Sequence, residues 1–173
     1  MLRPVLRFLL TLAAAVALQV VGMRITPGFV RWVDPFLAIT IYVSLAVPGP
    51  PALVAGSATG LARDVLSGAA YGLHGFANTA VAYVAARLQM RLVVQDPLRS
   101  ALLFALCAAV QQVILALLIF FTQPQMAVPR AADALALTLT TALLGGGAVA
   151  LVARIRRWRE ETQAARRKRL RLE

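Results

Sequence analysis

The chain has 173 residues, of which 60% are hydrophobic and 14% charged, and its 18 Lys and Arg against 7 Asp and Glu give a net charge of +11. A soluble globular domain carries about 45 to 50% apolar and about 25% charged residues, because it must present a polar surface to water. This composition excludes an ordinary soluble protein and predicts an exterior that faces lipid. At about 20 residues per crossing, the length allows five or six transmembrane helices, and we expect no separate soluble catalytic domain.

Apolar runs bounded by charges and prolines predict the positions of these helices. The first run extends from Phe8 to Met23, and the Arg7 side chain can reach the headgroups. Residues 35–62 form 28 uncharged positions, too many for one upright helix, and Pro48-Gly49-Pro50-Pro51 divides them into a hairpin. The expected helices span residues 4–23, 29–47, 51–66, 71–90, 97–121 and 131–153, and a basic tail follows at 154–173.

Short local signals predict several helix boundaries. Asp34-Pro35 and Asp96-Pro97 each place a capping residue before a proline at the first helical position, so the second helix begins at Phe29 or at Pro35. Ser67-Gly68 and Gly72 favour a turn after the third helix. The basic start and Ala/Leu core of the first helix also resemble a signal peptide, whose cleavage would leave the remaining orientation unchanged.

The distribution of Lys and Arg predicts the orientation, because cytoplasmic segments collect basic residues. Six crossings with both ends in the cytoplasm place only Arg24, Arg31, Arg63 and Arg130 outside. The tail alone carries nine Lys and Arg against three Glu. It begins with a stop-transfer cluster, Arg154, Arg156, Arg157, Trp158 and Arg159. We expect this tail to attract anionic lipids, with a specific cytoplasmic partner as the alternative, and we expect no nucleic-acid binding.

Side chains that could carry catalysis are scarce. Asp64 ends an apolar run, so it is either a functional group or a structural one that caps a helix or pairs with a nearby arginine at the outer interface. His74 is the only histidine and Cys107 the only cysteine, so neither a disulfide within the chain nor a thiolate metal site forms. We expect no catalytic residue, no metal site and no cofactor. Asn78, Gln111 and Gln112 are expected to hydrogen-bond between helices.

Glycines spaced by four residues accompany Asp64. Gly56 and Gly60 lie on one helix face and permit close backbone approach, either by another helix of the same bundle or by a foreign helix. Gly68 and Gly72 suit a turn that requires positive φ. Gly145-Gly146-Gly147 in the sixth expected helix forms a second small-residue patch with the same two interpretations.

The combined motif resembles the signature of the rod shape-determining protein MreD family. Its residues are Gly56, Gly60, Leu61, Asp64, Gly68, Gly72, Leu73 and His74. The resemblance implies a non-enzymatic, multi-pass protein of the bacterial inner membrane that is required for rod shape and supports lateral peptidoglycan synthesis. It implies direct binding of MreC and, in the same complex, RodA, a class B penicillin-binding transpeptidase and MreB. Gly56 and Gly60 would then shape a helix-docking groove, and the other motif residues would hold the outer turn.

The same resemblance implies a six-helix fold similar to that of the substrate-binding subunits of energy-coupling-factor vitamin transporters. Such a subunit is therefore the alternative function. The spacing of Ala13 and Ala17 fits a contact with a transport partner. The expected outer loops carry few polar groups for a vitamin pocket, which favours the scaffold.

Overall fold

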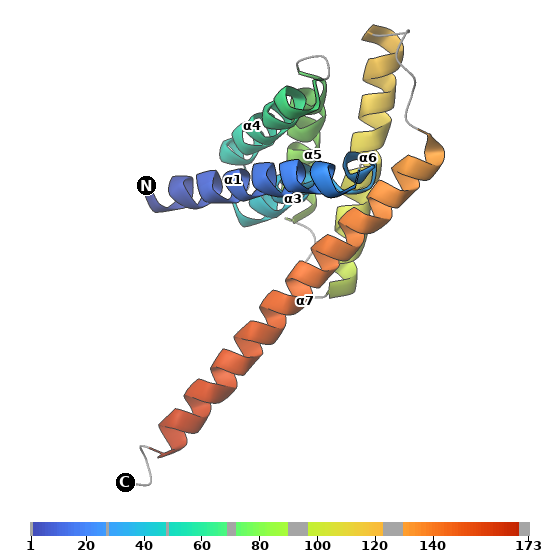
Figure 1. The fold of residues 1–173 in the computed structure, drawn as a ribbon. Coiled ribbons are helices and arrows are strands. Elements are labelled where there is room, and N and C mark those ends of the chain that lie inside the picture. The colour runs from blue at the N-terminus through green and yellow to red at the C-terminus, as the bar shows by residue number, and fades with distance from the viewer. Residues whose placement is uncertain are drawn as a thin grey trace.

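The fold is described from a computed structural model, which describes residues 2–26, 28–47, 49–68, 72–89, 97–122 and 130–169. Within these residues all regular elements are α-helices (Figure 1). They are α1 (Leu2–Ile25), α2 (Phe29–Trp32), α3 (Pro35–Ala46), α4 (Pro50–Ser67), α5 (Leu73–Gln89), α6 (Pro97–Thr122) and α7 (Ala131–Arg169). The predicted all-helical class is confirmed for the described residues.

Within the part of the chain that the structure describes, four segments are long and apolar enough to cross a membrane: Val5–Ile25, Phe29–Ala46, Pro97–Thr122 and Ala131–Ala148. They agree with the membrane protein predicted from composition. α4 and α5 are not among them; α4 carries Arg63 and Asp64, and α5 has 17 residues. The six crossings therefore stay a prediction.

The expected second helix is divided in two. The single-turn helix α2 ends before Val33, which has extended backbone at φ −128° and ψ 125°. α3 begins after Asp34, whose Oδ1 accepts a hydrogen bond from the Leu37 backbone N–H at 3.0 Å, with Pro35 in the first turn. The predicted Asp34 cap is confirmed. The corresponding cap at Asp96, and the expected helix ends at Tyr71 and Met90, lie outside the described residues.

Positive-φ glycines bound the turn between α4 and α5. Gly68 ends α4 in the left-handed conformation at φ 61°, and Gly72 precedes α5 at φ 99°. The predicted positive φ at both positions is confirmed. An L-residue in this conformation would bring its Cβ too close to the following carbonyl oxygen, which costs about 1–2 kcal/mol.

The apolar core lies where α3, α5, α6 and α7 meet. Its buried members are Leu37, Ile41, Val81, Ala85, Leu103, Phe104, Cys107, Ala108 and Leu137. α4 pairs closely with α5, and α6 with α7. The hydroxyls of Thr40 and Thr59 join α3 to α4 at 2.5 Å. At the α6–α7 crossing, a Cβ on Gly145 would collide with the Phe104 ring and one on Gly146 with the Ala101 Cβ, so these two glycines of the second patch pack inside the bundle, whereas Gly147 is exposed.

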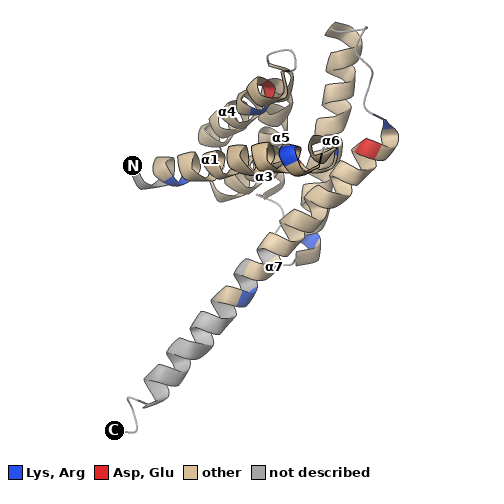
Figure 2. Cartoon of the chain, viewed as in Figure 1, with Lys and Arg blue, Asp and Glu red and all other residues tan. Residues whose placement is uncertain are grey.

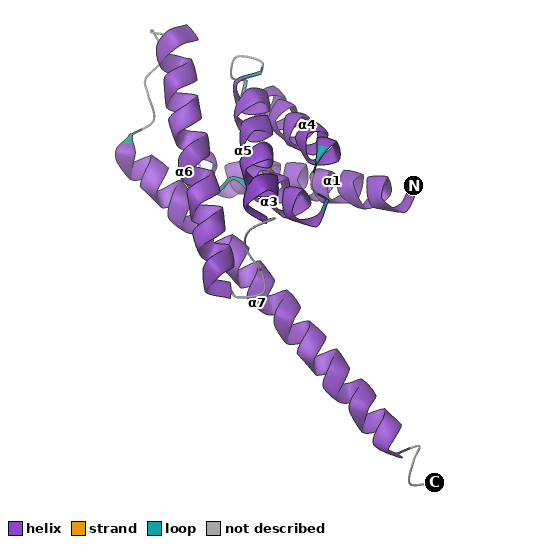
Figure 3. Ribbon diagram, turned by 180° about the vertical axis from the view of Figure 1, so that it is seen from behind, coloured by secondary structure: helices purple, strands orange, loops and turns teal. Residues whose placement is uncertain are grey.

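Large apolar side chains cover the outside of the bundle. α1 packs mainly against α2 and α3 and projects away from α6 and α7 in both ribbon views (Figures 1 and 3). Leu6, Leu10 and Val21 on α1 are more than half exposed, as is Phe121 on α6. The charged residues coloured in Figure 2 are few and, apart from Arg154 within α7, lie toward helix ends. This distribution fits a lipid-facing exterior, because hydrocarbon solvates apolar side chains and excludes charge.

α7 differs from the expected division into a helix at 131–153 and a separate tail. It continues without a break for 39 residues from Ala131 to Arg169. At 1.5 Å per residue it is about 58 Å long, roughly twice the hydrocarbon thickness of a bilayer. No glycine or proline interrupts the sequence between Ala148 and Arg169, which explains the continuity. Residues 154–169 of the tail are therefore an extension of the last helix.

Candidate functional site

Asp64, near the end of α4, closes the turn to α5 with its buried carboxylate. Its Oδ2 accepts hydrogen bonds from the backbone N–H groups of Gly72 at 2.9 Å and Gly75 at 3.1 Å. Its Oδ1 accepts from the backbone N–H of His74 at 3.1 Å and from the ring Nδ1 at 2.7 Å. The carboxylate thus satisfies free N–H groups at the start of α5, where the helix dipole also favours negative charge.

The contact with Asp64 determines the ring chemistry of His74. An ionised carboxylate can only accept, so Nδ1 carries the ring proton. Nε2 of the neutral ring is then an acceptor on the opposite edge. The His74 side chain lines the pocket described below, so this second nitrogen is available to a group there.

A second polar cluster connects α3, α4, α5 and α6. Arg63 Nη1 forms an ion pair with Asp34 Oδ2, and both residues are buried. Gln111 Nε2 donates to Asp34 Oδ2 at 3.2 Å and to Asn78 Oδ1 at 2.7 Å. The predicted interhelical bonding by Asn78 and Gln111 is confirmed, whereas Gln112 lines the pocket.

The ion pair is the part of this site that the sequence analysis missed. Asp34 was expected to be a helix cap only, and Arg63 was expected near the outer interface. Both side chains are in fact buried, Asp34 being 2% and Arg63 7% exposed, and they pair with each other. The available signal was the scarcity of charge: Arg63 interrupts an apolar helix next to Asp64, and a buried cation needs a counter-ion. The two partners are 29 positions apart in the sequence, and no local pattern pairs them.

The glycine face of α4 is filled by α5. A Cβ built on Gly56 would lie 2.7 Å from the backbone oxygen of Asn78 and 2.8 Å from the Ala82 Cβ. A Cβ on Gly60 would lie 2.6 Å from the Gly75 Cα and closer still to the His74 carbonyl. Of the two interpretations of this face, internal packing holds. The α5 backbone occupies the face on which the family resemblance implied a docking groove.

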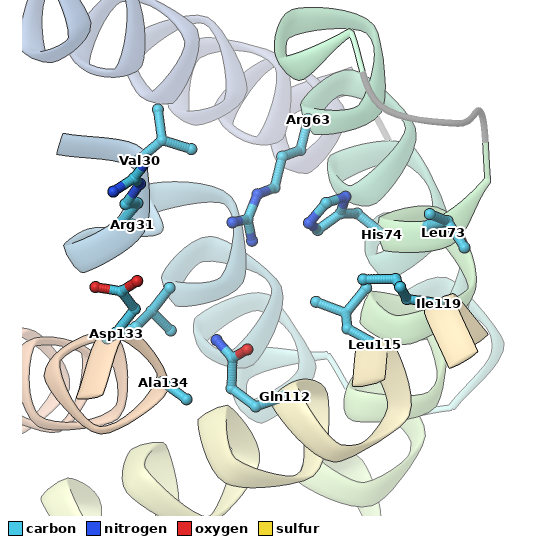
Figure 4. A pocket seen from close by; sticks show the side chains of 11 residues that line it. Val30, Arg31, Arg63, Leu73, His74, Gln112, Leu115, Ile119, Asp133 and Ala134 are labelled. Carbon is cyan, nitrogen blue, oxygen red and sulfur yellow. The ribbon is translucent and has the colours of Figure 1, made fainter. Parts of the chain in front are cut away.

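A pocket of about 290 Å³ lies beside these clusters (Figure 4). Its polar lining residues are Arg31 from α2, Arg63 from α4, His74 from α5, Gln112 from α6 and Asp133 from α7. Leu73 from the motif and Leu115 and Ile119 from α6 supply apolar walls. The Arg63 guanidinium extends into the space between Arg31 and His74 (Figure 4). No group of three or more His, Cys, Asp and Glu in the described part of the chain could hold a metal ion.

The motif residues thus lie close together because α4 packs against α5 and the chain reverses between these two helices. Asp64, Gly72 and His74 are hydrogen-bonded, Gly56 and Gly60 contact α5, and Gly68 and Leu73 flank the turn. The family model of the rod shape-determining protein MreD matches residues 2–144. The chain belongs to the MreD family. No curated protein and no solved structure matches it significantly.

Membership of the MreD family gives the protein a role in rod-shape determination and a place in the rod-shape complex. The matched range includes both polar clusters and every residue that lines the pocket. The basic tail lies beyond it. Arg154 is exposed, whereas the side chains of Arg156, Arg157, Trp158 and Arg159 lie outside the described part.

Asp64→Asn is expected to lower the free energy of unfolding by about 2 kcal/mol. The amide NH₂ must replace one carboxylate oxygen and then faces backbone N–H groups, which lose their acceptor at about 1–3 kcal/mol each. Thermal unfolding of the purified protein in detergent measures the change. Asp133→Asn is the control, because Asp133 forms no ion pair within the described residues. Equal stability of the two variants would contradict a structural role for the Asp64 charge.

Proposed function

We propose that this MreD-family protein is a non-enzymatic scaffold of the bacterial cell-elongation machinery, binding MreC directly and supporting lateral peptidoglycan synthesis. The observation that carries the proposal is the family match over residues 2–144. RodA, a class B penicillin-binding transpeptidase and MreB belong to the same complex, through direct or indirect contact. The structural polar clusters fit this role, since Asp64 and Asp34 are occupied in joining helices.

The proposed setting is the bacterial inner membrane, with six crossings and both ends in the cytoplasm. An alternating path puts the starts of α3, α5 and α7 and the end of α4 on the outer side. Contacts among these ends support this path: Arg63 pairs with Asp34, Asp64 binds His74, and Asp133 lines the same pocket. In this orientation the basic end of α7 lies in the cytoplasm, where it attracts anionic lipids.

The partner surface must lie away from the Gly56 and Gly60 face, which α5 fills. Val54, Leu61 and Val65 on α4 are 69%, 46% and 66% exposed. Their spacing of seven and four residues puts them on one helix face. Leu61 is also a motif residue, so we place the MreC contact on this face. An apolar face on a membrane helix associates with another helix through close packing.

Affinity purification of the tagged protein from gently solubilised native membranes tests the proposal. A photo-crosslinking residue is placed at Leu61 and, in a matched control, at Leu143 of α7, which is 74% exposed. We expect MreC, RodA and the transpeptidase to be recovered with the protein, and MreC to crosslink from position 61 and not from 143. Mass spectrometry identifies the recovered chains.

One result would overturn the placement of the MreC contact on α4, and another would overturn the proposed function. Crosslinking to MreC from position 143 alone would move the contact to another helix. Recovery of a transmembrane coupling subunit with paired ATPases, and no MreC, would favour the alternative of a solute-binding subunit of an energy-coupling-factor transporter. The pocket between α2, α4, α5, α6 and α7 is the observation that would suit that alternative.

A further inference from the structure

We propose that the pocket between α2, α4, α5, α6 and α7 binds the headgroup of a membrane phospholipid, with the phosphate at Arg63. Arg63 is 7% exposed, and its guanidinium points into the pocket (Figure 4). Within the described residues it bonds only to Asp34, through Nη1. The remaining guanidinium N–H groups are donors of fixed geometry, which suit the oxygens of a phosphate group.

The opposite edge of the pocket supplies acceptors and further donors. His74 is turned toward Arg63 in Figure 4, with Nδ1 held by Asp64, so its Nε2 faces a bound headgroup. Gln112 adds a side-chain amide, which can donate and accept. These groups come from α4, α5 and α6, so the cavity is formed by the tertiary packing and not by one loop.

The apolar walls favour a lipid over a soluble anion. Leu115, Ile119 and Leu137 line the pocket beside the polar groups. Ile119 is partly exposed on α6, a helix whose outer face is apolar. An acyl chain can therefore leave the pocket along α6 and cover these walls. A free phosphate would leave these apolar side chains in contact with water, so its binding would gain no free energy from their burial.

Asp133 adds selectivity for an amine-bearing headgroup. Its carboxylate faces Arg31 across the pocket in Figure 4, and the structure gives no ion pair between them. Asp34 balances the charge of Arg63, so Arg31 and Asp133 leave the pocket with one charge of each sign. A zwitterionic phosphoethanolamine headgroup matches this arrangement, because its ammonium suits Asp133 and its phosphate suits Arg63 and Arg31.

Native mass spectrometry of the full-length protein in detergent tests the proposal. The added probes are short-chain phosphatidylethanolamine, short-chain phosphatidylglycerol, glycerophosphoethanolamine and inorganic phosphate. Ile119→Trp fills the pocket, and Leu117→Trp is its control, because Leu117 is 53% exposed on the same helix and does not line the pocket. Arg31→Gln removes a surface cation at the pocket, and Arg24→Gln removes one outside it.

We expect phosphatidylethanolamine to bind the wild-type protein and both controls with equal affinity. Arg31→Gln should weaken binding about tenfold, because the phosphate loses one charge-assisted hydrogen bond. Ile119→Trp should weaken binding by about the same factor, because the indole occupies space that the lipid needs. Asp133→Asn should abolish the preference for phosphatidylethanolamine over phosphatidylglycerol. Unchanged lipid binding in Ile119→Trp would overturn the site. Binding of inorganic phosphate or glycerophosphoethanolamine as tight as that of the lipid would overturn the lipid as its occupant.

Discussion

Asp34→Ala is expected to lower the free energy of unfolding by about 4 kcal/mol. The substitution leaves the Arg63 guanidinium buried without a counter-ion, and breaking a buried pair in this way costs about 3–5 kcal/mol. It also removes the acceptor for Gln111 Nε2 and the cap on the Leu37 backbone N–H. Unfolding of the purified protein in detergent, followed by heat or by denaturing detergent, measures the loss.

Asp34→Asn separates the two roles of this carboxylate. Asparagine caps helices about as well as aspartate, so this variant loses the ion pair and keeps the cap. It should be more stable than Asp34→Ala by about 1 kcal/mol. Arg63→Met completes a double-mutant cycle, in which replacing both charges should cost less than the sum of the single changes. Additive effects would show that Asp34 and Arg63 contribute independently, contrary to the buried pair.

Gly60→Leu is expected to destabilise the protein by more than about 3 kcal/mol, because extra side-chain volume in a packed contact costs about 1–3 kcal/mol even when neighbours can move. At Gly60 the obstacles are the backbone carbonyl of His74 and the Gly75 Cα, which cannot rotate away. α4 and α5 must separate, which also strains the bonds that Asp64 makes to the same turn.

Gly147→Leu is the matched control for Gly60→Leu. Gly147 lies within α7, and a Cβ there meets no atom within 4 Å. Leucine has a higher helix propensity than glycine by about 0.8 kcal/mol, so this variant should be at least as stable as wild type. Yield of folded protein and thermal unfolding in detergent compare the two. A Gly60→Leu variant as stable as Gly147→Leu would contradict close packing of α4 against α5.

Several features followed from local sequence alone. Composition predicted the membrane environment, because a lipid-facing exterior requires more apolar residues than a soluble surface allows. The Asp34 cap and the positive φ of Gly68 and Gly72 depend on neighbouring residues only, and all were predicted. The eight-residue motif, read as a whole, indicated the family that the matched range of 2–144 shows.

Contacts between distant segments could not be predicted from local sequence. The pairing of Arg63 with Asp34 was not predicted, and the occupant of the Gly56 and Gly60 face was left open, because that occupant is a backbone segment of α5. α7 continues as one helix through residue 153, since a change from apolar to basic composition marks a membrane boundary and not a helix end.

Sequence by itself therefore determined the class of protein, the turn between α4 and α5, and the family. Tertiary structure decided the partners of Arg63, the occupant of the glycine face and the existence of the pocket. The physical reason is the distance along the sequence over which each interaction acts. Caps and turns arise from hydrogen bonds within a few residues, whereas a buried charge takes its counter-ion from whichever helix packs beside it.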